Sequence, residues 1–83
     1  MNRNSTQILC EVLDLTQSQT STSEIIRSVN LAHPRFKVLI TKLVDSGLVV
    51  KISKDYVITD KGRILLDEYK KFHGIAEAFG LEI

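Results

Sequence analysis

Basic and hydroxyl-bearing side chains gather in the middle of this 83-residue chain, between His33 and Lys54. Such groups neutralise negative charge and donate hydrogen bonds, so their chemistry is the binding of a polyanion. If the polyanion is DNA, Arg35 and Thr41 are the best candidates for contacts to the edges of its bases, because a guanidinium can form two parallel hydrogen bonds with guanine. The full predicted set comprises His33, Arg35, Lys37, Thr41, Lys42, Lys51 and Lys54.

The distribution of charge along the chain supports this interpretation, although the formal net charge is only +1. Residues 27–63 contain eight basic and three acidic side chains, which gives this segment a charge of +5. Residues 1–26 and residues 64–83 each carry a charge of −2. A basic middle between two acidic ends indicates a polyanion-binding face. The alternative is that these cations only keep the surface soluble.

Patterns for other kinds of chemistry are missing from the sequence. The single cysteine, Cys10, allows neither an internal disulfide nor a zinc cluster, and its apolar helical context predicts a small buried side chain. No nucleophile–base pair or glycine-rich phosphate loop is present, so we expect neither an enzyme nor a cofactor or small-molecule substrate. The polar segment MNRNSTQ has no signal-peptide pattern, and no apolar run is long enough to span a membrane. We therefore expect a cytoplasmic protein.

The stretch from Leu31 to Leu48 predicts the helix that positions most of the basic side chains. Its apolar residues recur at i, i+3, i+4 and i+7 and form one stripe, which consists of Phe36, Leu39, Ile40 and Leu43. Pro34 suits the first turn of a helix, and Gly47 suits its end. An apolar back with a cationic front fits a DNA major groove. A solvated surface helix is the alternative for this segment.

The patterns on either side of this helix predict two further helices and a hairpin. The first helix is capped by Asn4 or Ser5 and fades near residues 15–17, and a polar loop follows over residues 16–23. A short helix then runs from a capping box at Ser21 to Val29 or Asn30. Residues 48–59 alternate as a β-hairpin with Lys54 at its tip and Lys51 on its outer face. The inward positions of these elements predict one core, formed by Val12, Ile26, Phe36, Ile40, Leu43, Ile52 and Ile58.

The chain resembles small archaeal winged helix-turn-helix regulators in three segments, ILCEVL, NLAHPRFKVLITKLVDSGLV and YVITDKGRILLDEY. It is similar in plan to crenarchaeal ten-kilodalton coiled-coil chromatin proteins. The resemblance implies an α+β, mostly α, fold with three helices, a β-hairpin wing and a C-terminal helix. It also implies binding of double-stranded DNA in a transcriptional or nucleoid-associated chromatin role. Pro34 and Val38 depart from it, since polar residues are commoner at those places. A winged-helix module that binds another protein is the alternative.

The last part of the chain predicts a dimerisation helix. We expect residues 1–61 to form the DNA-binding domain and residues 62–83 to form a C-terminal helix. Apolar residues follow one another in alternating steps of four and three, as in a coiled-coil seam, at Leu65, Tyr69, Phe72, Ala76, Phe79 and Ile83. Ile64, Leu66 and Ile75 lie beside this seam, where they would pack on the domain. The resemblance implies an antiparallel homodimer. The alternative is that the chain bends at Gly74 and folds back over the first helix.

Overall fold

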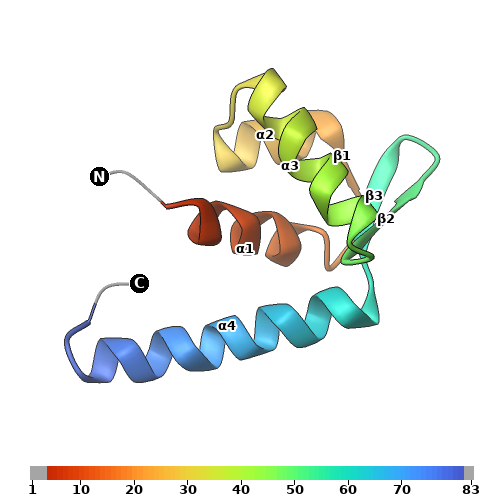
Figure 1. Ribbon diagram of the computed structural model, residues 1–83. Coiled ribbons are helices and arrows are strands. Elements are labelled where there is room, and N and C mark those ends of the chain that lie inside the picture. The colour runs from red at the N-terminus through yellow and green to blue at the C-terminus, as the bar shows by residue number, and fades with distance from the viewer. Residues whose placement is uncertain (1–3, 82–83) are drawn as a thin grey trace.

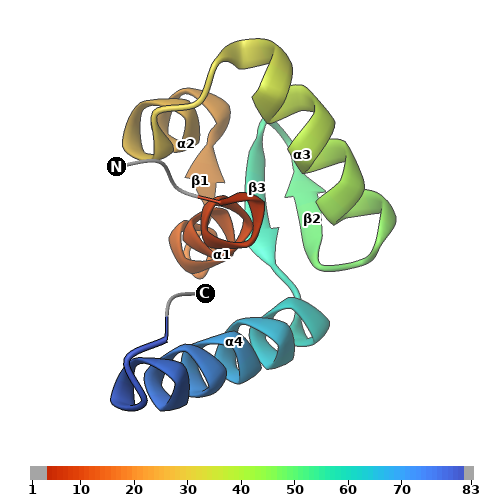
Figure 2. The same cartoon turned by 60° about the vertical axis from the view of Figure 1, so that its left-hand side comes forward.

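The structure is a computed structural model that describes residues 4–81, and its elements follow the predicted order with one short strand added (Figure 1). Helix α1 lies between α4 on one side and the α2–α3 pair on the other (Figure 1). Figure 2 shows α4 crossing below α1 and the ends of the strands. The elements are α1 (Ser5–Leu15), β1 (Thr20–Ser21), α2 (Thr22–Val29), α3 (His33–Asp45), β2 (Val49–Ile52), β3 (Asp55–Ile58) and α4 (Asp60–Ala78).

Local hydrogen bonds explain where the first two helices begin and end. Asn4 caps α1 through a reciprocal pair: its Oδ1 accepts from the Gln7 N–H at 2.8 Å, and its own N–H donates to Gln7 Oε1 at 2.9 Å. Ser21 Oγ accepts from the Glu24 N–H at 3.3 Å and so caps α2 as predicted. Asn30 ends α2 in the left-handed conformation, with φ of +57°. The turn between α2 and α3 therefore uses asparagine in place of glycine.

The polar segment predicted as a loop contains the added strand, β1. The sheet order is β1-β3-β2, and Thr20 pairs with Tyr56 on the antiparallel β3. The hydroxyl of the buried Thr20 donates to the carbonyl of Leu15 at 2.9 Å, and the carbonyl of the buried Thr16 accepts from the Ile58 N–H at 2.7 Å. Hydrogen bonding thus allows a segment without apolar side chains to enter the core.

Most of the predicted core is confirmed. Val12, Phe36, Ile40, Leu43 and Ile58 are buried in one cluster, and Ile26 packs against it half-buried. The cluster is completed by Ile8, Cys10, Leu13, Ile25, Val29, Leu31, Val49, Tyr56 and Leu66.

The prediction for Ile52 is wrong, since 45% of this residue is exposed. The strand register gives the reason: Val49 pairs with the buried Ile58, whereas Ile52 pairs with Asp55 on the opposite sheet face. The same register corrects the placement of Lys51. It pairs with Tyr56, so it lies on the sheet face that Tyr56 turns towards the core and not on the outer face.

The end of α3 is fixed by a backbone motif and by a lysine from α4. Gly47 has a φ of +76°, which L-residues rarely adopt, and the Leu48 N–H donates to the carbonyl of Leu43 at 2.9 Å. Lys61 Nζ donates to the carbonyl of Ser46 at 2.9 Å, which places a cation at the negative end of the α3 dipole. The start of α4 therefore supports the orientation of α3.

Thr59 and Gly62 hold the start of α4 against the base of the wing. Thr59 Oγ1 accepts from the Gly62 N–H at 3.1 Å and donates to the carbonyl of Gly47 at 2.6 Å. A Cβ atom on Gly62 would lie only 2.2 Å from the carbonyl oxygen of Leu48. The absence of a side chain at Gly62 thus permits the close approach of α4 to the base of the wing. The whole arrangement is the predicted α+β, mostly α, fold: three helices, a hairpin wing and a C-terminal helix.

Candidate nucleic-acid interface

Helix α3 is anchored to the sheet through aromatic packing at its N-terminal half. Phe36 is 3% exposed, and its ring meets the ring of Tyr56 on β3 edge-on, with centroids 6.2 Å apart. The ring of His33 lies at 6.5 Å from that of Phe36, also edge-on. Such pairs add stability beyond the area that they bury. The packing fixes which side of α3 faces solvent, and it positions His33 at the exposed start of the helix.

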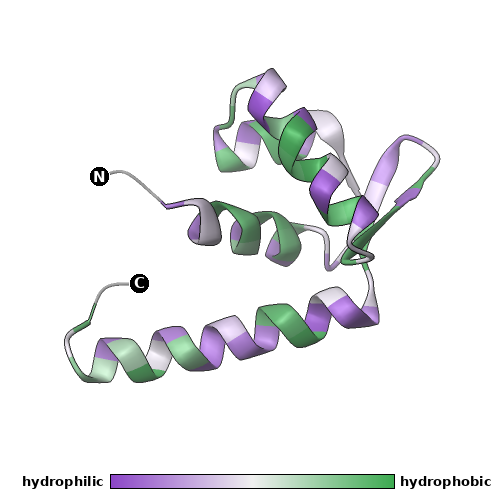
Figure 3. Cartoon of the chain, in the orientation of Figure 1, coloured by the Kyte–Doolittle hydropathy of each residue, from purple (hydrophilic) through white to green (hydrophobic). Residues whose placement is uncertain are grey.

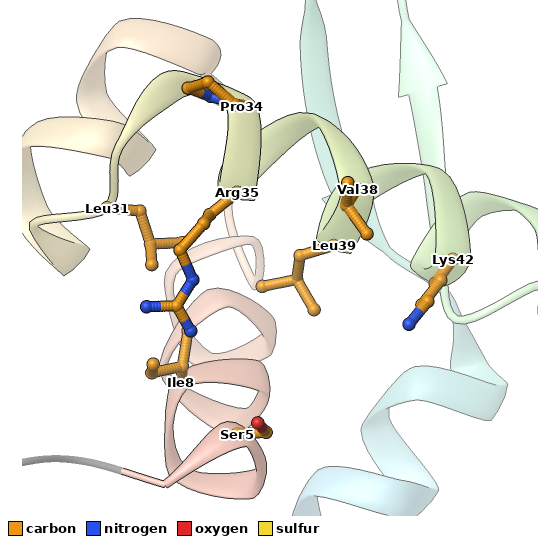
Figure 4. Close-up of a pocket in the computed structure, with 8 residues that line it drawn as sticks. All are labelled: Ser5, Ile8, Leu31, Pro34, Arg35, Val38, Leu39 and Lys42. Atoms are coloured by element: carbon orange, nitrogen blue, oxygen red, sulfur yellow. The ribbon is translucent and has the colours of Figure 1, made fainter.

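The polar residues of α3 divide between two flanks of its exposed surface. A turn of 100° per residue places Lys37 and Thr41 on one flank and Arg35 and Lys42 on the other. Figure 4 shows Arg35 and Lys42 directed towards the side on which α1 lies. Val38, 59% exposed, lies between the two flanks. The structure therefore keeps all four polar residues exposed but does not gather them into one row.

The Thr41 side chain is already engaged within its own helix. Its Oγ1 donates to the carbonyl of Lys37 at 2.8 Å. This uses the only hydrogen of the hydroxyl, so in this arrangement Thr41 offers a lone pair and no donor. As a base contact, Thr41 is then suited to an amino group and not to a carbonyl.

The wing carries the other two predicted cations. Lys51 is exposed near the end of β2, on the sheet face shared with Tyr56. Lys54 lies in the turn between β2 and β3, next to Ser53, whose φ of +57° is in the left-handed region. The hairpin projects beyond the helices beside α3 (Figure 1). Lys51 and Lys54 are thus held on a projecting element adjacent to the basic helix.

The cations of α3 and the wing lack acidic partners among the described residues, whereas three cations of α2 and of the second half of α4 have them. Within residues 4–81, Arg35, Lys37, Lys42, Lys51 and Lys54 form no ion pair. By contrast, Arg27 pairs with Glu24, Lys70 with Asp14 and Lys71 with Glu68, at 3.8, 3.2 and 3.4 Å respectively. Lys61 and Arg63 at the start of α4 also have no acidic partner in this part of the chain. The unpaired positive charge therefore extends over α3, the hairpin and the start of α4, where it is available for an anionic partner.

The exposed apolar surface of α4 differs from the predicted seam in two members. Leu65, Phe72 and Phe79 are 40%, 60% and 77% exposed, as a free seam requires. Ala76, however, is 3% exposed, and Tyr69 packs against the core cluster, so both turn towards the domain. Ile83 lies outside the described residues. Figure 3 shows hydrophobic residues along α4 beyond its hydrophilic first turn.

Two isoleucines that were expected to pack on the domain are instead exposed, Ile64 at 65% and Ile75 at 59%. Leu66 does pack inward, at 2% exposed. Helical geometry explains the error. Leu65 and Phe72 are seven residues apart and therefore lie on the same side of the helix, and Ile75, three residues after Phe72, lies beside them. We call this surface the apolar face of α4: Ile64, Leu65, Phe72, Ile75 and Phe79.

A cleft of about 400 Å³ between α1 and α4 is lined by the single cysteine, Cys10, and by Tyr69. The centroid of the Tyr69 ring lies 5.7 Å from that of the His73 ring. Burial raises the pKa of the Cys10 thiol, and the nearby Lys70 ammonium offsets this in part. Burial also raises the pKa of Tyr69, with smaller contributions from Cys10, Glu11 and Glu77. A neutral thiol is a poor nucleophile and metal ligand, so Cys10 acts as a core side chain.

Comparison with known families agrees with this geometry. The model of the winged helix-turn-helix family matches residues 2–77, which includes every strand and nearly all of α4. The chain belongs to the winged helix-turn-helix family. No curated protein matches this winged helix-turn-helix chain. Membership of the family indicates, at the coarse level, a DNA-binding regulator.

Two further observations apply to the described part of this winged helix-turn-helix protein. No helix within residues 4–81 is long and apolar enough to cross a membrane. The same residues contain no group of three His, Cys, Asp or Glu side chains that is arranged to hold a metal ion.

Proposed function

We propose that the protein binds double-stranded DNA with α3 in the major groove and the wing on the phosphate backbone. The observation that carries this proposal is the set of five unpaired, exposed cations on α3 and the wing, in contrast to Arg27, Lys70 and Lys71, which are in ion pairs. Unpaired lysines and arginines release counterions from DNA on binding, and this release provides affinity without sequence preference. Such binding suits a transcriptional regulator or a nucleoid-associated chromatin protein.

The two flanks of α3 suggest a division of roles. Lys37, Lys42 and the wing residues Lys51 and Lys54 contact phosphates, because a single ammonium forms no fixed pair of hydrogen bonds. Arg35 is the candidate for guanine, provided that its side chain turns away from α1 when DNA binds. The exposed Val38 suits the methyl group of a thymine. Non-specific affinity therefore exceeds sequence discrimination in this proposal.

We further propose that the protein is a homodimer formed through the apolar face of α4. The exposed fractions of Phe72 and Phe79, 60% and 77%, are large for aromatic residues on a soluble helix. The resemblance to archaeal coiled-coil chromatin proteins supports an antiparallel pairing of the two α4 helices. A symmetric dimer would hold two α3 helices at a fixed spacing, so its preferred DNA site would be roughly palindromic.

The charge dependence of DNA binding tests the proposal. We expect Arg35→Gln with Lys37→Gln to weaken binding to a short labelled duplex, measured by fluorescence anisotropy at several salt concentrations. The slope of log affinity against log salt should become shallower by roughly 0.9 for each phosphate that the variant no longer neutralises. Arg27→Gln with Lys71→Gln is the matched control, because it removes the same charge from cations that are paired in the structure. Equal effects from both pairs would contradict the proposed face.

A protein-binding module is the second candidate, and the apolar outward surface of α3 favours it. Pro34 and Val38 are both exposed there, between the two basic flanks. A helix that presents apolar residues outward can contact a protein partner, and winged helices serve both purposes. Failure of the wild-type protein to bind a heparin column or the duplex at low salt would favour this candidate.

A further inference from the structure

A groove between α1 and α3 combines an apolar floor with a basic rim. Its volume is about 390 Å³, which is within the range of small-molecule sites. Ile8 of α1 and Leu31 are buried beneath it, and Leu39 of α3 is half-buried. Figure 4 shows the Arg35 side chain extending from α3 towards Ile8 at one end, with Lys42 near the other end. The lining residues are completed by Ser5, Pro34 and Val38.

The charges around this groove all have one sign. Among the described residues, none of those that line it is acidic, and neither Arg35 nor Lys42 is in an ion pair. Ser5 is the first residue of α1, whose first turn also contains no acid, so the positive end of that helix dipole is not neutralised. An uncompensated positive potential over an apolar surface favours a ligand that has an anionic group and an apolar body.

We propose that this groove binds a small organic monocarboxylate with an aliphatic or aromatic body. The carboxylate pairs with the guanidinium of Arg35 or the ammonium of Lys42, two residues whose Cα atoms lie about 10 Å apart along the helix axis, given seven residues at 1.5 Å each. The apolar body covers Ile8, Leu31 and Leu39 and removes their exposed area from water. The groove is too small for a folded peptide segment, so the ligand is a small molecule.

Ligand binding in the groove would antagonise DNA binding, and this part rests on the proposed function. Arg35 and Lys42 are two of the cations that we assign to DNA. A carboxylate that pairs with either side chain lowers the positive charge available to phosphates, and one that pairs with Arg35 also keeps that side chain folded towards α1. Because the two ligands use the same side chains, each weakens the binding of the other.

Octanoate is a suitable probe, and backbone amide chemical shifts of the full-length protein report where it binds. We expect octanoate, below its micelle concentration, to shift the amides of Ile8, Leu31 and Leu39. Arg35→Gln with Lys42→Gln should weaken octanoate binding by about tenfold, because the double variant removes both alternative partners of the carboxylate and so loses the charge-assisted hydrogen bond. Lys37→Gln with Lys51→Gln is the matched control, since it removes the same charge from residues outside the groove, and should change little.

Two comparisons decide between this proposal and ordinary apolar adsorption. Octanol that bound as tightly as octanoate would overturn the role of the cations, and octanoate shifts confined to the cleft around Cys10 and Tyr69 would overturn the site. A separate measurement tests the antagonism with DNA. Saturating octanoate should weaken the binding of the duplex by the wild-type protein, and an unchanged affinity for the duplex would overturn the antagonism. A protein that bound octanoate in the groove but never bound DNA would contradict the proposed function and leave the ligand site standing.

Discussion

Two glycines in α4 provide matched substitutions with opposite expected effects. A Cβ at Gly62 would meet the carbonyl oxygen of Leu48 at 2.2 Å and Cγ1 of Ile58 at 2.6 Å. The Leu48 carbonyl also accepts the Thr59 N–H at 3.0 Å, so it cannot move away without loss of that hydrogen bond. Overpacking of this kind costs about 1–3 kcal/mol, and because backbone is involved we expect about 3 kcal/mol for Gly62→Ala. At Gly74 a Cβ would meet nothing within 4 Å.

Gly74→Ala should therefore stabilise the protein, by about 1 kcal/mol, because alanine is the better helix former. For a domain of this size, 1 kcal/mol corresponds to a rise in Tm of roughly 4–8 °C. Urea unfolding followed by circular dichroism, at one protein concentration, measures both variants against wild type. If Gly62→Ala were as stable as wild type, the close packing of α4 against the base of the wing would be wrong. A loss of stability in Gly74→Ala would contradict the open surroundings of that residue.

Three further predictions concern the core, the thiol and the apolar face of α4. Phe36→Ala should lower the free energy of unfolding by roughly 3–5 kcal/mol, and a thermal melt that moved by only a degree or two would contradict its burial. The pKa of Cys10 is raised in the folded state, so as pH rises the thiol loses its proton in the unfolded chain before it does so in the folded one. The stability of the wild-type protein should therefore fall as pH rises above the ordinary thiol value of 9.0. Urea titrations below and above that pH should show a smaller fall in Cys10→Ala, and an equal fall would exclude the thiol as its source. Light scattering should report a dimer for wild type and for Arg63→Glu, a change at an exposed residue outside the apolar face. It should report a monomer for Phe72→Glu with Phe79→Glu. A wild-type monomer at micromolar concentration would refute dimerisation.

Much of the fold follows from local patterns in the sequence. The apolar stripe from Phe36 to Leu43 predicts both the position of α3 and its buried side, since helical period and burial agree there. Pro34 and Gly47 mark its ends because their backbone preferences are independent of distant contacts. Strand β1 has no such local signal. Thr20 becomes part of the sheet only through its pairing with Tyr56, which is far away in sequence.

The errors in the hairpin and in α4 arise where an apolar run is compatible with more than one choice of which residues face the core. Residues 48–50 are all apolar, so alternation alone does not decide whether Val49 or Val50 points inward. The pairing of Val49 with Ile58 decides it, and Ile52 is placed outward as a result. In α4, apolar residues on two adjacent sides of the helix allow a seam through Tyr69 and Ala76 as readily as one through Ile75. Contact with α1 selects which side is buried.

The candidate site was predictable in its residue types and less so in its geometry. The five cations from Arg35 to Lys54 are exposed, as their types predict, and all five lack acidic partners within the described residues. The direction of Arg35 and Lys42 towards α1 depends on how α1 and α3 pack, for which the sequence has no local pattern. The groove beneath them, with Ile8 as part of its floor, was missed for the same reason.

Mapping of a DNA duplex onto the protein by backbone amide chemical shifts tests the central claim most directly. We predict that a short duplex shifts the amides of Lys37, Thr41, Lys51 and Lys54 on α3 and the wing, and that these shifts weaken as salt is added. The amide of Arg27, whose side chain is paired with Glu24, should stay unchanged. Shifts that clustered on α4 instead, or no shifts at low salt, would contradict DNA binding through α3 and the wing.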